Sequence, residues 1–197
     1  MDIQKLLPFL GMPALLIAVE ILALLLSSPL QESGAMAFED PSAVENSLIF
    51  IFFLLVMTAI MLILIRVRVK WFIKYFIAFA IATSLFYVFL AIATILTGGT
   101  FWGFVLSIMF ATIATVILYK YPAWYVIDAF GILIAAGVAS IFGISLAILP
   151  VLILLVLLAV YDAISVYRTR HMITLAEGVL ETKAPILFVI PKKADYS

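Results

Sequence analysis

Asp162 is the residue whose chemistry most needs an explanation, because it lies within a long apolar run. The residues before it, 149–160, are almost entirely aliphatic, and Tyr161 immediately precedes it. A carboxylate at membrane depth costs roughly a few kcal/mol on insertion scales, so it usually faces a bundle interior or a water-filled cavity and usually has a function. A carboxyl group in that setting can hold or exchange a proton, as general acid–base catalysis requires. A structural carboxyl that joins two helices by hydrogen bonding is the alternative, and both readings are open at this point.

Two further acids lie within apolar segments. Asp128 follows Trp124 near an expected helix start, where the positive end of the helix dipole favours negative charge, so a structural role is expected. Glu20 lies deeper in the first apolar segment, and the sequence indicates no partner for it. Tyr161 is either an ordinary interfacial aromatic residue or a residue whose hydroxyl lines the same cavity as Asp162.

Several other kinds of site are excluded. The 197-residue chain has no Cys and a single His, His171, which rules out a thiolate metal site, a Cys nucleophile and a His-Glu-x-x-His zinc site. It also lacks a Gly-x-Ser-x-Gly element, so the usual serine hydrolase arrangement is not expected. We predict no metal and no cofactor. A formal net charge of zero provides no global field that would favour nucleic acid.

Composition places these residues in a multi-pass membrane protein. The chain is 68% hydrophobic, whereas soluble domains are about 45–50% apolar. The excess forms long apolar stretches, each close to the roughly 20 residues that span a bilayer. The sequence therefore predicts an all-α protein with six transmembrane helices, at about residues 7–30, 48–65, 71–96, 101–119, 124–142 and 147–167.

Loop charges predict the orientation of this bundle. Residues 31–47 contain acids and no Lys or Arg, whereas basic residues gather at 66–74, at Lys120 and after residue 167. Because basic loops mark the cytoplasmic side, both termini are expected in the cytoplasm and residues 31–47 outside. Asp162 then lies about 9 Å from the cytoplasmic end of its helix, at 1.5 Å per residue. We divide the chain into a transmembrane domain, 1–170, and a cytoplasmic tail, 171–197.

Two patterns concern packing and the tail. Small residues four apart on the fifth helix predict a face for close helix packing, namely Gly131, Ala135, Ala139 and Gly143. In the tail, residues 172–179 have the apolar spacing of a short amphipathic helix at the membrane interface. Apolar residues between Pro185 and Pro191 predict a short edge strand, made of Ile186, Leu187, Phe188, Val189 and Ile190.

The residues around Asp162 resemble a known family. Val160-Tyr161-Asp162-Ala163-Ile164-Ser165-Val166-Tyr167 resembles the Tyr-Asp motif on the sixth helix of presenilins and signal peptide peptidases. Residues 168–185 are similar to the segment that follows this helix in presenilin-like proteins, especially archaeal ones, and residues 122–128 resemble the start of their fifth helix. The resemblance covers essentially the whole chain, as the first six helices of a nine-helix fold.

This resemblance implies an intramembrane aspartyl endopeptidase that hydrolyses peptide bonds within transmembrane substrates. Asp162 would be one of two catalytic aspartates, with Tyr161 beside the cavity, and strand 186–190 would pair with an extended substrate. The family's second Asp lies in a Gly-x-Gly-Asp motif on helix seven, and a Pro-Ala-Leu motif lies on helix nine. This sequence contains no Gly-x-Gly-Asp, and its Pro13-Ala14-Leu15 is near the N-terminus. We therefore expect an N-terminal part that is inactive alone and acts with a C-terminal fragment carrying helices seven to nine.

Two other functions fit the same acids. A transporter or channel could use Glu20, Asp128 and Asp162 as an ion path, although such proteins often contain internal repeats and the two halves of this chain show none. A non-catalytic scaffold could bind membrane partners through the small-residue face of the fifth helix. A Gly-x-Gly-Asp motif in coding sequence downstream of residue 197 would favour the protease.

Overall fold

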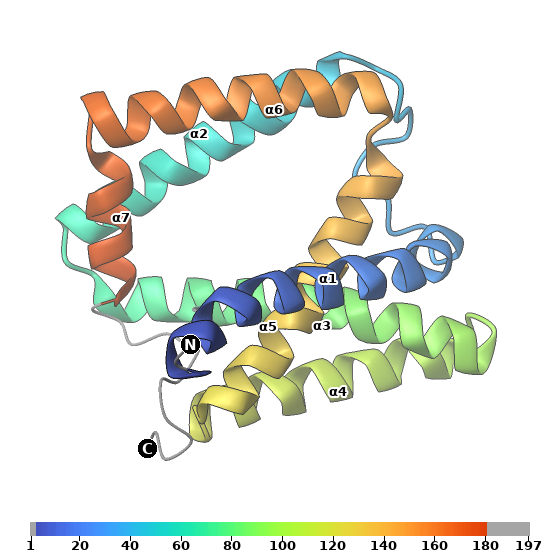
Figure 1. The fold of residues 1–197 in the computed structure, drawn as a ribbon. Coiled ribbons are helices and arrows are strands. Elements are labelled where there is room, and N and C mark those ends of the chain that lie inside the picture. The colour runs from blue at the N-terminus through green and yellow to red at the C-terminus, as the bar shows by residue number, and fades with distance from the viewer. Residues whose placement is uncertain (1–2, 181–197) are drawn as a thin grey trace. The chain divides into compact units, whose positions relative to one another are not determined.

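The computed structural model describes residues 3–180 and consists of helices joined by short turns and by one longer loop, residues 33–44 (Figure 1). Candidate strand 186–190 lies outside the described residues. The helices are α1 (Ile3–Glu32), α2 (Glu45–Arg66), α3 (Lys70–Thr97), α4 (Phe101–Lys120), α5 (Trp124–Ser145), α6 (Ile148–Ala163), the π-helix η1 (Ile164–Arg168) and α7 (His171–Leu180). The described residues form two compact units, which are described separately: residues 3–36 and 80–142, and residues 37–79 and 143–180.

Six helices within the described residues are long and apolar enough to cross a membrane: α1 to α5, and α6 together with η1. This confirms the predicted all-α architecture with six transmembrane helices. The chain's three tryptophans, Trp71, Trp102 and Trp124, each lie in the first two residues of a helix. Tryptophan is enriched where a helix meets the membrane–water interface, so these positions agree with helices that begin at that interface.

In the first unit, α3 packs closely against α4. The rings of Phe86 and Phe104 lie 5.5 Å apart in an edge-to-face arrangement, and those of Phe89 and Phe110 lie 5.8 Å apart. At the start of α4, Gly103 is buried, and a Cβ atom there would collide with the Thr97 hydroxyl. Aromatic pairing along the helices and a glycine at the α3–α4 turn therefore hold this hairpin together.

The small residues of α5 that are buried differ from those predicted. Ala136, Gly137 and Ser140 are buried, whereas Ala139 is exposed. A Cβ atom on Gly137 would lie 2.5 Å from Val88 Cγ2 on α3, so this glycine permits the close approach. The predicted face was wrong by about one residue, or 100° around the helix, because the spacing of small residues does not determine which of two adjacent faces meets a neighbour.

In the second unit, α2 and α6 contact each other and run in the same direction (Figure 1). The hydroxyl of Ser47 donates to the Pro150 carbonyl at 2.7 Å, and the hydroxyl oxygens of Thr58 and Tyr161 are 3.2 Å apart. Thr58 lies 11 residues after Ser47 on α2, and Tyr161 lies 11 residues after Pro150 on α6. On both helices this separation is about three turns, or about 16 Å. The two helices therefore stay in register from the start of α2 to the end of α6.

The loop before α2 is fixed to the start of α6. The amide of Ala37 donates to the Ser145 hydroxyl, and the amide of Ala147 donates to the Pro41 carbonyl, each at 2.8 Å. Within the loop, hydrogen bonds from the hydroxyl and the amide of Ser42 stabilise the carboxylate of Asp40 and hold its pKa below the ordinary value. Asp40 therefore remains negatively charged, as the acidic side of the predicted topology requires.

At the other end of the second unit, two basic residues adopt left-handed backbone conformations. Arg68 has φ 59° between α2 and α3, and Arg170 has φ 56° between η1 and α7. Each lies at the turn that follows a long apolar helix, Arg68 after α2 and Arg170 after η1. Helix α7 begins at His171 and contacts both α2 and η1. The assignment of residues 171–197 to a cytoplasmic tail stays a prediction.

Candidate active site

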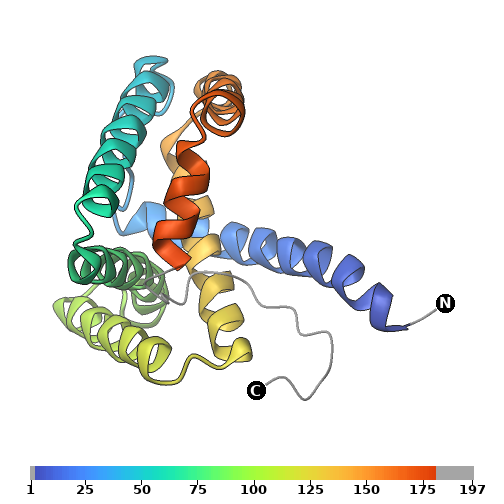
Figure 2. The same cartoon turned by 90° about the vertical axis from the view of Figure 1, so that its left-hand side faces the viewer.

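Tyr161 is fixed from two sides. Its hydroxyl lies 3.2 Å from Thr58 Oγ1 on α2 and 3.1 Å from His171 Nε2 at the start of α7, and the Tyr161 and His171 ring centroids are 5.7 Å apart. All three side chains are half-buried. Figure 2, which turns the molecule by 90°, shows α7 leaving the end of α6 at a steep angle. Two neighbouring helices, α2 and α7, therefore determine where the last turn of α6 points.

Asp162 is turned away from these contacts. Successive residues of an α-helix are about 100° apart around the axis, so the residue after Tyr161 does not face α2. Its side chain is exposed, and no side chain or amide among residues 11–180 donates a hydrogen bond to its carboxylate. Its backbone carbonyl does accept a bond of 3.0 Å from the buried Ser165 hydroxyl. The carboxyl group is thus held on an ordered backbone while its oxygens remain accessible to a reacting group.

A change of helix type follows directly after Asp162. Residues Ile164–Arg168 form a π-helix, and the Thr169 amide donates to the Ile164 carbonyl, five residues back, at 3.0 Å. Short π-helical turns within α-helices are rare and occur frequently at functional sites. The wider turn changes the direction of the chain before Arg170 and the start of α7, which brings His171 back to Tyr161.

Gly178 brings the far part of α7 against α2. A Cβ atom on this residue would lie 2.6 Å from Cδ1 and 2.7 Å from Cγ1 of Ile65. Real Cβ atoms essentially never approach so closely, so only glycine fits without movement of Ile65. His171 and Gly178 thus connect α7 to the rest of the second unit at two points, and both lie on the half-buried face of the helix.

The other predicted acids belong to the first unit. Glu20 is exposed on α1, and Asp128 is half-buried on α5. Helix α5 begins at Trp124 and has no acidic residue in its first turn, so Asp128 lies beyond the region where a helix dipole acts strongly. The helix dipole, which was the structural role predicted for Asp128, therefore stabilises this carboxylate less than expected. Within the described residues, no group of three His, Cys, Asp or Glu side chains could hold a metal ion.

Sequence reasoning missed the contact of His171 with Tyr161. The single histidine served only to exclude metal and serine chemistry, because it lies outside the apolar runs. The available signal was local: Thr169 and His171 place two polar side chains immediately after the helix that carries Tyr161 and Asp162. Their significance depends on Thr58, which is 103 residues away from Tyr161 in the chain.

Comparison with known proteins agrees with this geometry. A family model described as signal-peptide peptidase, presenilin aspartyl protease matches residues 13–197. A structure of a presenilin family intramembrane aspartate protease in space group P2 is 53% identical, with a TM-score of 0.71 over 89% of this chain and 70% of that chain. Another, in space group C222, is 49% identical, with a TM-score of 0.69 over 94% and 76%. No curated protein matches.

The resemblance inferred from the Tyr161-Asp162 segment is confirmed by these matches. They extend over the helices of both compact units, and the match to the family model includes Asp162. Together with the six membrane-length helices, they establish both the fold and the class of reaction. The chain therefore belongs to the signal-peptide peptidase and presenilin family of intramembrane aspartyl proteases.

Proposed function

We propose that Asp162 is one of the two carboxyl groups with which this protein hydrolyses peptide bonds in membrane-spanning substrates. The observation that carries the proposal is the contrast between adjacent residues: Tyr161 is hydrogen-bonded on both sides, whereas the Asp162 carboxylate is exposed and accepts no bond from residues 11–180. A structural carboxyl that joined two helices would be occupied by a donor. An unoccupied carboxyl on an ordered helix can instead share a proton with a second acid.

The reaction requires two carboxyl groups in different protonation states. Two nearby acids share one proton because like charges cannot both ionise easily. The ionised carboxylate takes a proton from water, the water oxygen attacks the peptide carbonyl, and the protonated acid donates its proton to the departing nitrogen. Because the two groups share one proton, the roles of acid and base belong to the pair rather than to Asp162 individually.

The partner carboxyl is proposed to come from a C-terminal segment that carries helices seven to nine. The sequence contains no Gly-x-Gly-Asp. The other two acids within apolar helices, Glu20 and Asp128, do not lie in such a motif. We infer that residues 1–197 alone do not cleave, since a single carboxyl cannot supply both the base and the acid.

The substrate must be unwound before it can be cut, because a helix engages its peptide carbonyls in its own hydrogen bonds. We propose that residues 186–190 pair with the unwound substrate as an added strand. The support is the sequence: five large apolar residues lie between two prolines, and proline tends to confine a strand to an edge that keeps one side available.

Complementation tests this function. Co-expression with a related C-terminal segment that carries Gly-x-Gly-Asp is expected to produce cleavage of a single-span substrate in lipid vesicles, whereas residues 1–197 alone are expected to leave it intact. Mass spectrometry of the products would locate the cut within the membrane-spanning part of the substrate. Cleavage by the purified chain alone, abolished in Asp162→Ala, would show instead that an acid of this chain completes the pair.

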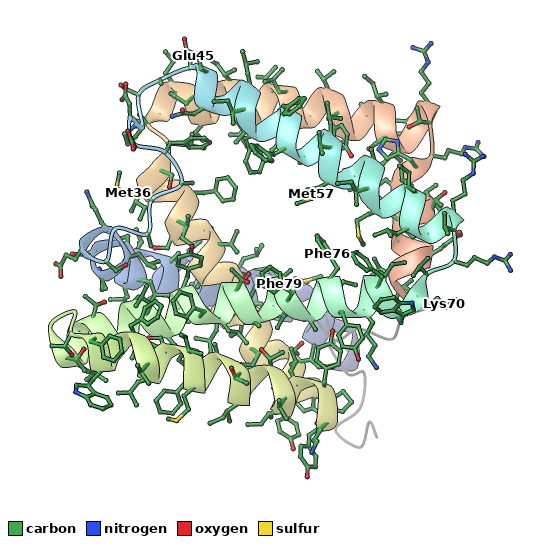
Figure 3. All side chains as sticks on the ribbon, turned by 180° about the vertical axis from the view of Figure 1, so that it is seen from behind. Met36, Glu45, Met57, Lys70, Phe76 and Phe79 are labelled. Atoms are coloured by element: carbon green, nitrogen blue, oxygen red, sulfur yellow. The ribbon has the colours of Figure 1, made fainter. Side chains whose placement is uncertain are left out.

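The orientation is also a proposal, and the separation of charge supports it. Figure 3 shows Glu45 at the first turn of α2 and Lys70 at the start of α3, which follows the opposite end of α2. The charged loop that contains Asp40 precedes the acidic end, and Arg66 and Arg68 lie at the basic end. The positive-inside rule therefore places Lys70 and both described ends of the chain on the cytoplasmic side.

Single-cysteine labelling tests the orientation, because the natural chain has no Cys. Glu39→Cys and Val67→Cys place exposed thiols at opposite ends of α2 without removing a basic residue. A membrane-impermeant maleimide added to intact cells is expected to label residue 39 at once, and residue 67 only after permeabilisation. The reverse pattern would overturn the proposed orientation.

A further inference from the structure

Both ring nitrogens of His171 are engaged. Nε2 lies 3.1 Å from the Tyr161 hydroxyl, and Nδ1 lies 2.5 Å from the Thr169 hydroxyl. The Thr169 hydroxyl is also 3.2 Å from the Ile164 carbonyl, to which it donates. Five groups from α2, α6, η1 and α7 thus form one chain of hydrogen bonds that runs from Thr58 to the π-helical turn after Asp162.

One hydrogen position sets the direction of every bond in this chain. A hydroxyl has one hydrogen to donate, and the Thr169 hydroxyl has two acceptors within reach, the Ile164 carbonyl and His171 Nδ1. We assign the hydrogen to the carbonyl, which can only accept, so Thr169 accepts from His171 and Nδ1 carries a hydrogen. In a neutral ring the other nitrogen is then an acceptor, so Tyr161 donates to Nε2 and Thr58 donates to Tyr161. This assignment of hydrogens follows from the network, as tautomers in protein structures generally do.

We propose that His171, as its Nδ1–H tautomer, is a positioning residue for the Tyr161-Asp162 end of α6; the part that concerns Asp162 rests on the proposed function. His171 accepts the Tyr161 hydrogen and thereby fixes the rotation of the last α-helical turn. Asp162 is the next residue on that turn, and its carboxylate accepts no hydrogen bond from residues 11–180, although its backbone carbonyl accepts one from Ser165. Its orientation therefore depends on the contacts of Tyr161.

The π-helix makes this support necessary. Immediately after Asp162 the regular α-helical bonds give way to a wider turn, so the backbone downstream does not hold the residue as a continuing α-helix would. The network crosses this turn, because Thr169 binds the first residue of η1 and His171 binds the residue before Asp162. It joins the two ends of the irregular segment through side chains.

Nitrogen-15 spectroscopy tests the tautomer directly, and the single histidine makes the assignment unambiguous. In residues 1–197 with ¹⁵N-labelled histidine, in lipid discs at pH 8, we expect a protonated Nδ1 and an unprotonated Nε2. Free histidine prefers the opposite tautomer. Thr169→Val is expected to shift the spectrum toward that solution pattern, because the Nδ1 acceptor is lost. An Nε2–H tautomer or a doubly protonated ring in the wild type would overturn the proposal.

Thr112→Val is the matched control for this substitution. Thr112 is exposed on α4, and its hydroxyl bonds only to the Ile108 carbonyl of its own helix, at 2.8 Å. Removing that hydroxyl alters no residue of the network, so the histidine spectrum is expected to remain that of the wild type. An equal change in both valine variants would mean that the spectrum reports general perturbation, and the proposed direction of bonding would then fail.

Two amide substitutions separate positioning from folding in the complemented protease. His171→Gln can place an amide oxygen near the position of Nε2 and accept from Tyr161, whereas the shorter Asn reaches only the position of Nδ1. We expect His171→Asn and Tyr161→Phe to lower kcat by about 10- to 100-fold, as small misplacements of a reacting group do. KM is expected to change little, and Gln is expected to restore most of kcat.

The two substitutions introduce the same amide group, yet we expect a low kcat for His171→Asn and a high kcat for His171→Gln. Equal kcat values for His171→Asn and His171→Gln, whether both high or both low, would exclude positioning through Nε2. Absence of cleavage by the complemented wild-type protein would instead refute the proposed function, and the nitrogen-15 spectrum would still decide the hydrogen-bond direction independently.

Discussion

Replacing Asp162 by Asn is expected to abolish hydrolysis in the complemented protease, with a loss of about 10³-fold or more, and to leave its assembly intact. General acid–base catalysis by a positioned side chain contributes roughly 10²- to 10⁴-fold, and Asn keeps the size of Asp but cannot exchange a proton in the same way. The exposed carboxylate accepts no hydrogen bond from residues 11–180, so its replacement leaves no buried donor unsatisfied. The change in unfolding free energy is therefore expected to stay within about 0.5 kcal/mol.

Asp128→Asn is the control for removing a carboxyl group from an apolar helix. It neutralises a half-buried acid on α5 and is expected to retain most of the activity. Rates of substrate cleavage and co-purification of the two segments would be measured for both variants. An assembled Asp162→Asn protein that cut at the wild-type rate would show that Asp162 is structural.

Adding one methyl group at Gly178 is expected to loosen α7 from α2. In Gly178→Ala the new Cβ atom would lie 2.6–2.7 Å from two atoms of Ile65, so the Ile65 side chain or the whole of α7 must move. Overpacking of this kind destabilises by typically about 1–3 kcal/mol. That exceeds the gain of about 1 kcal/mol or less from replacing a helical glycine by alanine. Denaturant titration in detergent would measure the unfolding free energy.

Ile65→Ala provides the second side of a double-mutant cycle. Without the larger side chain the clash disappears, so Gly178→Ala is expected to become neutral or stabilising by up to about 1 kcal/mol in that background. Gly143 on α5 is a second control. A Cβ atom added there would have open space around it, with nothing within 4 Å, so Gly143→Ala is expected to cause no loss of stability. Equal effects of Gly178→Ala with and without Ile65 would refute the proposed contact.

The sequence was sufficient to predict the helices and to single out Tyr161-Asp162 as the candidate pair. Hydropathy marks each membrane-length segment directly, and a carboxyl in an apolar run is conspicuous, so six helices and Tyr161-Asp162 were identifiable. It was not sufficient to predict which face of a helix is buried against its neighbours. On α5 the predicted Ala139 is exposed while Ala136 and Ser140 are buried, because the identity of the neighbouring helix determines which face is covered.

The π-helix and the network were unpredictable for a related reason. The sequence of η1, Ile-Ser-Val-Tyr-Arg, contains no glycine or proline that would signal an irregular turn. His171 becomes informative only when Thr58 and Tyr161 are brought together by helices in parallel register. Local sequence describes the elements, whereas these contacts depend on how α2, α6 and α7 meet.

The left-handed conformations of Arg68 and Arg170 have a consequence for membrane insertion. A left-handed conformation costs a residue with a side chain about 1–2 kcal/mol, and glycine would avoid that strain. Under the proposed orientation, however, glycine would also remove two of the cations by which the inserting chain is oriented. At these two turns the most stable folded backbone and the most reliable insertion therefore require different residues, and the natural chain has the residue that favours insertion.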